Sequence, residues 1–163
     1  SFGEGDTEVD TFVDFMCPIC GDFEDTYGAA LQDAAAADEI TLNVHPVSIL
    51  DRLSQNTEYS TRAGSAVYCV AAEAPDSTLD FFNSLFENQP AENTPGLSDD
   101  ELIALAEQAG AGGAADCITD GTYKRFVGSQ TDQHEIQGTP TVEIDGERID
   151  NSEIGTRFAE ILG

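Results

Sequence analysis

The sequence predicts an α/β fold in which a block of helices interrupts a small mixed sheet. Two strand patterns flank a helical stretch near the N-terminus, helical spacing dominates the middle of the chain, and a strand–turn–strand pattern with a final helix closes it. The 163 residues, 40% of them apolar, suffice for one domain with its own core. We expect an α/β domain from residues 1–50 and 136–163, with residues 51–135 inserted as an all-helical subdomain.

The N-terminal strands and their connecting helix form the first unit. Residues 7–15 alternate between apolar and polar side chains, and residues 40–47 do so again before and around a proline. Helical spacing runs between them through an alanine-rich stretch. Because a single helix joins the two strands, we expect them to be parallel.

The middle of the chain is a succession of helices. Residues 59–74 have helical spacing, and a second helical pattern runs from 77 to 86. Ser98 followed by Glu101 is the sequence of a capping box, so another helix begins there. One or two more helices are expected between 113 and 137, with three side chains facing the core: Ile118, Phe126 and Val127.

A hairpin and a helix end the chain. Residues 142–144 alternate as a strand, Asp145-Gly146 is a hairpin turn signal, and residues 147–149 form the return strand. Residues 152–162 then have the spacing of an amphipathic helix.

The charge of the chain excludes some partners. Thirty-two acidic residues against six lysines and arginines give a formal net charge of −26. Such a surface repels phosphates and anionic headgroups, so neither nucleic acid nor a membrane surface is expected as the main partner. Solubility in high salt is the expected role of the charge, and steering of a basic partner is the alternative. No membrane span or signal peptide is visible, but Ser1 leaves a removed leader or anchor open.

Four cysteines form one close pair and one distant pair. Cys17 and Cys20 follow the first strand, whereas Cys69 and Cys117 lie in two different helices of the insertion. Such a set suggests two disulfides, or one disulfide and one redox pair. Stable disulfides form in oxidising compartments, which favours an exported protein. A cytosolic chain with two buried free thiols is the alternative.

The tetrapeptide Cys17-Pro18-Ile19-Cys20 has the position of a redox motif, between a strand and a helix of a β-α-β unit. With Cys17 at the N-cap and Pro18 at the first helical position, the helix dipole and unpaired N–H groups stabilise a thiolate. The Cys17 pKa should therefore fall below its free value of ~8.5. Cys17 would be the nucleophile, and the shielded Cys20 would resolve the mixed disulfide.

Two other interpretations of this pair are a plain structural disulfide and half of a zinc site. A zinc site needs about four ligands, yet there is no second close cysteine pair, and His45 and His134 have no ligand spacing. We therefore expect no metal. No organic cofactor is expected either, because the disulfide itself carries the electrons.

The order of motifs resembles the DsbA-like branch of the thioredoxin superfamily. The strand, the Cys-Pro-Ile-Cys tetrapeptide, the helices, Gly138-Thr139-Pro140-Thr141 and the hairpin follow one another over nearly the whole chain. The resemblance implies a thioredoxin-like fold and disulfide exchange with client proteins. It also implies a cis Pro140 facing the cysteines, with the backbone of Thr139 pairing with an extended substrate segment. A proline that merely starts a strand is the alternative.

This chain departs from the family's strongest oxidants. They have histidine where Ile19 stands, and isoleucine donates no hydrogen bond to the Cys17 thiolate. Four acidic side chains lie near in sequence and oppose a thiolate: Asp14, Asp22, Glu24 and Asp25. We expect a less depressed Cys17 pKa and a less oxidising pair. Glu24, one turn past Cys20, is a candidate proton acceptor, and a solvated surface acid is the alternative.

A bond between Cys69 and Cys117 would close a loop of about 50 residues and contribute on the order of 4 kcal/mol. We expect a structural disulfide there, with two buried free thiols or a second redox couple as alternatives.

The leading functional prediction is an exported, monomeric dithiol oxidase that introduces disulfides into client proteins and is reoxidised by a membrane partner. Reduction or isomerisation by the same site is a second hypothesis. A third is a non-catalytic binding module in which Cys17 and Cys20 form a fixed staple. A glutathione-dependent transferase of related fold normally has a single Ser or Cys, so Cys20 argues against that class.

Overall fold

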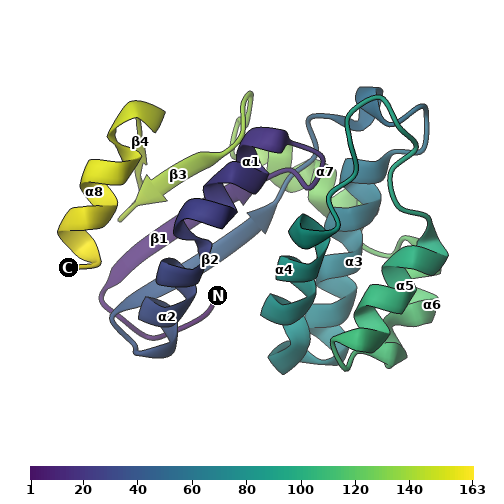
Figure 1. Cartoon of the computed structure of the whole chain (residues 1–163), viewed down its shortest axis with the longest axis horizontal. Coiled ribbons are helices and arrows are strands. Elements are labelled where there is room, and N and C mark those ends of the chain that lie inside the picture. Colours follow the sequence, from purple (N-terminus) through teal and green to yellow (C-terminus); the bar gives the residue numbers. More distant parts are fainter.

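The computed structural model describes residues 1–163 as a four-stranded sheet with a block of helices at one end (Figure 1). The strand order is β2-β1-β3-β4. Their bounds are Thr7–Val13 for β1, Ile40–Pro46 for β2, Thr141–Ile144 for β3 and Glu147–Ile149 for β4. Strands β1 and β2 are parallel, whereas β3 is antiparallel to both β1 and β4. The predicted α/β class and the parallel pairing of the first two strands are confirmed.

One long helical stretch connects β1 to β2. It consists of α1 (Pro18–Phe23), a π-helical turn over Glu24–Gly28, and α2 (Ala29–Ala36). The sequence predicted helix here but not the π-turn. Gly28 permits close packing of Glu24 within it, because a Cβ at position 28 would lie 2.6 Å from the Glu24 Oε2.

Five helices make up the helical block between β2 and β3. Their bounds are Tyr59–Glu73 for α3, Thr78–Glu87 for α4, Asp99–Gln108 for α5, Ala115–Asp120 for α6 and Lys124–Gln133 for α7. The capping box of Ser98 and Glu101 is confirmed, with both reciprocal bonds present. Gly121 separates α6 from α7. Its φ of +61° is in the left-handed region, which glycine adopts without the strain that a Cβ would add.

The prediction that Phe126 faces the core is wrong. Its side chain is 42% exposed, whereas its neighbour Val127 is fully buried. On a helix, adjacent residues point about 100° apart, so Val127 takes the inward position. Phe126 instead packs edge-on against Tyr68 of α3, with ring centroids 4.9 Å apart.

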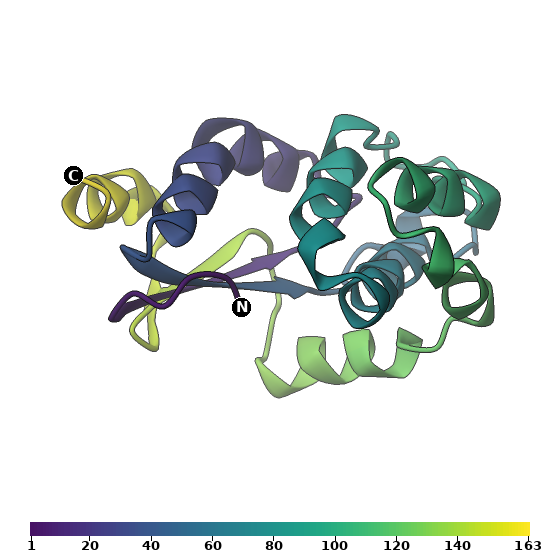
Figure 2. The ribbon, with the colours of Figure 1, turned by 90° about the horizontal axis from the view of Figure 1, so that it is seen from below.

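The helices cover both faces of the sheet. Figure 2 shows α1, α2 and the C-terminal α8 (Ile154–Ile161) on one face and α7 on the other. One buried cluster lies between the sheet and the first of these layers, around Val9, Leu31 and Phe158. A second joins the end of β1 to the helical block and contains both Cys17 and Cys20. The division into two domains stays a prediction, and the cysteines lie where the two parts share a core.

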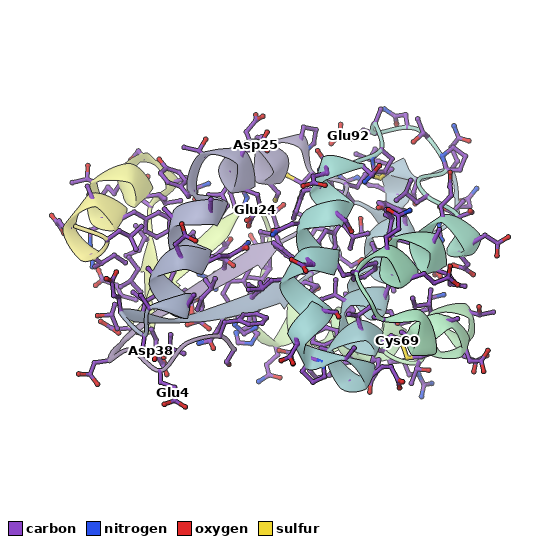
Figure 3. The ribbon with its side chains drawn as sticks, turned by 60° about the horizontal axis from the view of Figure 1, so that its bottom comes forward. Glu4, Glu24, Asp25, Asp38, Cys69 and Glu92 are labelled. Carbon is purple, nitrogen blue, oxygen red and sulfur yellow. A yellow bond between two sulfur atoms is a disulfide. The ribbon has the colours of Figure 1, made fainter.

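A disulfide joins Cys69 of α3 to Cys117 of α6 within the helical block (Figure 3, where Cys69 is labelled). It therefore links two helices through cysteines that are 48 residues apart in sequence. None of the helices combines the length and the apolar character that crossing a lipid bilayer demands.

Candidate active site

The local sequence places Cys17 at the start of α1. Strand β1 ends at Val13, and a turn closes with the Cys17 N–H donating to the Asp14 carbonyl over 3.0 Å. Cys17 is the N-cap with extended backbone angles (φ −80°, ψ 115°), and Pro18 occupies the first helical turn. Proline fits there because an N–H at that position would have no helical partner. This local geometry is the one that the sequence predicted.

The two thiols differ in exposure. Both cysteines are free thiols, but Cys17 retains 6% exposure whereas Cys20 has none. Only Cys17 can therefore meet another protein's sulfur without a rearrangement. This asymmetry fits an attacking Cys17 and a resolving Cys20.

The acidity of the two thiols differs in the same direction. The pKa of Cys17 is lowered to about 6, first by hydrogen bonding with the Cys20 side chain and further by Thr139 and the Cys20 backbone. Burial and the charge of Asp14 act against this lowering. The pKa of Cys20 is raised, mainly by burial. Cys17 is thus the group that is a thiolate near neutral pH.

The Thr139–Pro140 segment lies directly against Cys17, although 122 residues separate them in sequence. The peptide bond between Thr139 and Pro140 is cis, and the Cys17 thiol donates to the Thr139 carbonyl over 3.6 Å. The Thr139 hydroxyl is buried without a hydrogen-bond partner. Once Cys17 loses its proton, that hydroxyl is available to donate to the thiolate, which accounts for its part in lowering the pKa.

Two cavities meet at Pro140. The first, of about 250 Å³, has an apolar wall that includes Ile19, Phe23 and Ile154. The second, of about 310 Å³, is more polar and reaches Arg148. Ile19 is 63% exposed, so it offers an apolar surface beside Cys17 rather than a core contact. Pro140 therefore joins an apolar and a polar hollow, and the neighbouring Thr139 contacts Cys17.

Asp14 is a buried carboxylate at the centre of this region. Its Oδ1 accepts hydrogen bonds from the Met16 N–H (2.9 Å) and the Ser60 hydroxyl (2.7 Å). Its Oδ2 accepts from the N–H groups of Ile49 (2.9 Å) and Leu50 (3.1 Å). Burial raises its pKa despite these four donors. It ties the active-site turn to the helical block.

Asp14 was expected only as a nearby charge, and its structural role was missed. An aspartate at a strand end between Val13 and Phe15 was the available signal, because a buried carboxylate needs donors.

The other nearby acids do not reach the sulfurs. Asp22 and Asp25 are exposed, and the only bond between Glu24 and Cys20 is the helical one from the Glu24 N–H to the Cys20 carbonyl, which leaves the carboxyl and the thiol unconnected. Glu24, which is labelled in Figure 3, lines a cavity between its own helical stretch and α4. Gln32 and Asn83 also line this cavity. Burial first, and then the charge of Asp25, raise the Glu24 pKa to about 7.

The two histidines lie close together, which the sequence spacing did not indicate. Their ring centroids are 5.5 Å apart, and both rings contact Phe12. His45 also pairs with Asp10 over 2.6 Å. Nevertheless, no group of three or more His, Cys, Asp or Glu side chains is arranged to hold a metal ion.

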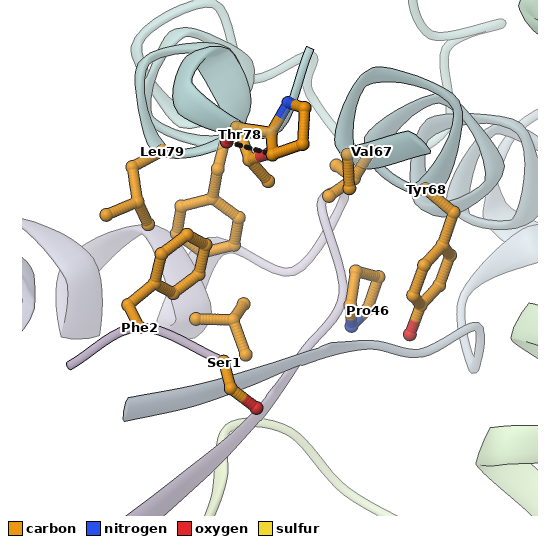
Figure 4. A pocket seen from close by; sticks show the side chains of 11 residues that line it. Ser1, Phe2, Pro46, Val67, Tyr68, Thr78 and Leu79 are labelled. Atoms are coloured by element: carbon orange, nitrogen blue, oxygen red, sulfur yellow. Dashed lines mark hydrogen bonds between the residues drawn. The ribbon is translucent and has the colours of Figure 1, made fainter. Parts of the chain in front are cut away.

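An apolar cavity of about 180 Å³ lies elsewhere, between β2, the N-terminal segment, α3 and α4. Figure 4 shows Phe2, Pro46 and Val67 around it. It shares no lining residue with the two hollows beside Pro140. It is therefore separate from the candidate active site.

Known proteins share this fold. The thioredoxin family model matches residues 3–162. The reduced disulfide bond oxidoreductase DsbG of Mycobacterium tuberculosis is 34% identical with a TM-score of 0.86, covering 95% of this chain and 76% of that one. Reduced DsbA of the same organism is 33% identical with a TM-score of 0.86, covering 95% and 80%.

A curated relative of another kind is the serine/threonine-protein kinase PknE of M. tuberculosis. It is 33% identical over 169 aligned residues, which cover 96% of this chain. The chain spans only 30% of the length of that kinase.

Proposed function

The chain belongs to the thioredoxin family, in its DsbA-like branch, and from this membership we propose that it is a thiol–disulfide oxidoreductase working through Cys17 and Cys20. The observation that carries the proposal is the acidic, slightly exposed Cys17 at a helix N-cap, backed by a buried Cys20 of raised pKa. A purely structural disulfide requires no such difference in exposure and pKa between its two cysteines.

The reaction exchanges one disulfide for another. A client thiolate attacks Cys17 of the oxidised pair, the Cys17–Cys20 bond breaks, and Cys20 leaves as a thiolate. A second client thiolate then attacks the client sulfur of this mixed disulfide and expels Cys17 as a thiolate. The client is oxidised by two electrons and the pair is reduced by two. The low pKa of Cys17 makes it a good leaving group in the second step.

Oxidation of clients is the direction that we propose for this exchange, with reduction or isomerisation by the same site as the alternative. Its pKa of about 6 lies between those of DsbA, about 3.5, and thioredoxin, about 7. One pKa unit corresponds to roughly 30 mV, so the two reference potentials of about −120 and −270 mV predict roughly −240 to −195 mV for this pair. Structural disulfides of secreted proteins lie below about −300 mV, so such a pair can form them.

Glu24 is proposed as the group that exchanges a proton with Cys20. Since burial raises the pKa of Cys20, the departing sulfur needs a proton. A carboxyl with a pKa of about 7 is suited to donating one near neutral pH and taking it back later. A water molecule would have to connect the two groups, because they share no hydrogen bond.

Client binding is assigned to the Thr139–Pro140 edge. The backbone there can pair with an extended client segment, while the apolar hollow beside Ile19 accepts one of its side chains. Clients would be exported proteins with reduced cysteines, and a membrane protein would reoxidise the pair. The Cys69–Cys117 disulfide supports a site of action outside the cytoplasm.

The test combines catalysis with trapping. Oxidised protein should accelerate disulfide formation in a reduced, unfolded client, and Cys17→Ser should abolish this. Cys20→Ser should accumulate a mixed disulfide through Cys17. If the wild type neither oxidises nor reduces any client, and Cys17→Ser leaves partner binding intact, the protein is a binding module instead.

A further inference from the structure

Gln89 connects the helical block to the backbone of the active-site turn. It follows α4, and its Nε2 lies 2.8 Å from the Cys17 carbonyl oxygen and 3.2 Å from that of Phe15. The amide group thus bridges two carbonyl groups on either side of Met16. No other side chain donates to a backbone carbonyl between residues 15 and 20.

Gly21, the fourth residue of α1, leaves room for this amide. A Cβ at Gly21 would lie 2.7 Å from the Gln89 Oε1, closer than atoms of these types pack. Gly21 has no left-handed backbone angle that would require glycine. Glycine inside a helix is destabilising relative to alanine, so the close approach of Gln89 gives a reason for its presence.

We propose that Gln89 is a positioning residue of the redox centre, which holds the Cys17 backbone so that its sulfur faces the N-terminus of α1. The inference rests on the proposed function of Cys17. The Cys17 carbonyl, held by Gln89, belongs to the peptide plane after Cys17, and the Cys17 N–H, which donates to the Asp14 carbonyl, belongs to the plane before it. Fixing both planes fixes the direction of the Cys17 Cα–Cβ bond, while the bond to the Phe15 carbonyl holds the preceding peptide of the turn. The helical block thereby sets the acidity of a thiol that belongs to the sheet domain.

Loss of the two Gln89 hydrogen bonds should lower the thiolate-to-thiol ratio of Cys17. The turn gains alternative orientations, in which the Cys17 thiolate loses contact with the Cys20 thiol and the Thr139 hydroxyl. Its thiolate-to-thiol ratio should fall about three- to tenfold, the equivalent of one typical hydrogen bond. The Cys17 pKa rises by the logarithm of the same factor.

The experiment measures the thiolate absorbance of Cys17 at 240 nm in reduced protein as a function of pH. Gln89→Ala should move the midpoint upward and slow alkylation at pH 5.5 about three- to tenfold. Gln55→Ala is the matched control, because Gln55 also donates its Nε2 to a backbone carbonyl of the helical block, that of Asn93 over 2.8 Å. It should leave the Cys17 midpoint unchanged.

A second variant, Gly21→Ala, disturbs the contact between Gly21 and Gln89 by changing its other partner. Gly21→Ala keeps Gln89 but displaces its amide, so it should raise the midpoint in the same direction. In the Gln89→Ala background, Gly21→Ala should leave the midpoint where it is, because the contact is already absent. This cycle separates a positioning effect from a general effect on helix α1.

Two outcomes overturn the inference. One is an unchanged midpoint in Gln89→Ala with a folded protein, and the other is an equal further shift from Gly21→Ala in both backgrounds. Either result leaves the oxidoreductase proposal standing if the wild type still exchanges disulfides with a client. Conversely, the wild type could prove inactive while Gln89→Ala still moved the midpoint of the Cys17 titration. That result would contradict only the proposed function.

Discussion

Substituting Glu24 by glutamine should change how the stability of the protein depends on pH. The carboxyl lies in the cavity between the π-turn and α4, packed over Gly28. Burial, with a smaller effect of Asp25, raises its pKa from 4.5 to about 7. Glutamine has nearly the same shape and cannot ionise, so the variant isolates the cost of the charge.

The raised pKa of Glu24 makes the folded protein less stable as pH rises. The folded state holds the Glu24 proton up to about pH 7, whereas the unfolded chain releases it near 4.5. Between these values the folded state binds more protons, so the wild type loses stability as pH rises. A shift of this size corresponds to at most about 3 kcal/mol, and partial exposure reduces the expected loss to about 1–3 kcal/mol.

The assay is urea unfolding of the disulfide-oxidised protein at intervals from pH 4 to 8, since oxidation removes the titration of Cys17. Glu24→Gln should match the wild type near pH 4 and exceed its free energy of unfolding by about 1–3 kcal/mol at pH 8. Asp33→Asn, at an exposed acid on α2, is the control and should leave the pH dependence unchanged. Parallel curves for Glu24→Gln and wild type would refute the buried-carboxyl argument.

Two more predictions follow from the cysteines and their surroundings. Replacing Cys69 and Cys117 together by alanine should lower the free energy of unfolding by about 4 kcal/mol and Tm by roughly 8–16 °C, as calorimetry would show; a loss below about 1 kcal/mol would contradict a structural role. Ile19→His should lower the Cys17 pKa and raise the reduction potential by roughly 30 mV per pKa unit, measured against glutathione, with little change in stability because Ile19 is 63% exposed. Ile19→Ala is its control, and an equal potential in both variants would count against a hydrogen bond from the imidazole.

Local signals predicted much of this structure. The capping box at Ser98 and the turn at Asp145-Gly146 were readable because each is decided by residues within four positions of one another. In that turn both residues have positive φ, 50° and 80°, as a tight hairpin requires. The start of α1 at Cys17-Pro18 was predictable for the same reason.

Long-range contacts were not predictable in this way. Gln89 lies outside every predicted helix and strand, and nothing near it in sequence indicates a bond to a carbonyl 72 residues away. Asp14 looked like an ordinary charge, although its four donors come from three separate segments. The π-turn after Phe23 was also hidden, since one extra residue per turn barely changes the apolar pattern.

The proposed oxidoreductase activity depends most on Cys17 being a thiolate near neutral pH. The direct measurement is the rate of iodoacetamide modification of Cys17 in the reduced protein between pH 4 and 10, with Cys17→Ser to show which signal belongs to it. The lowered pKa of Cys17 predicts a half-maximal rate near pH 6. A half-maximal rate near the ordinary value of about 8.5 would contradict it.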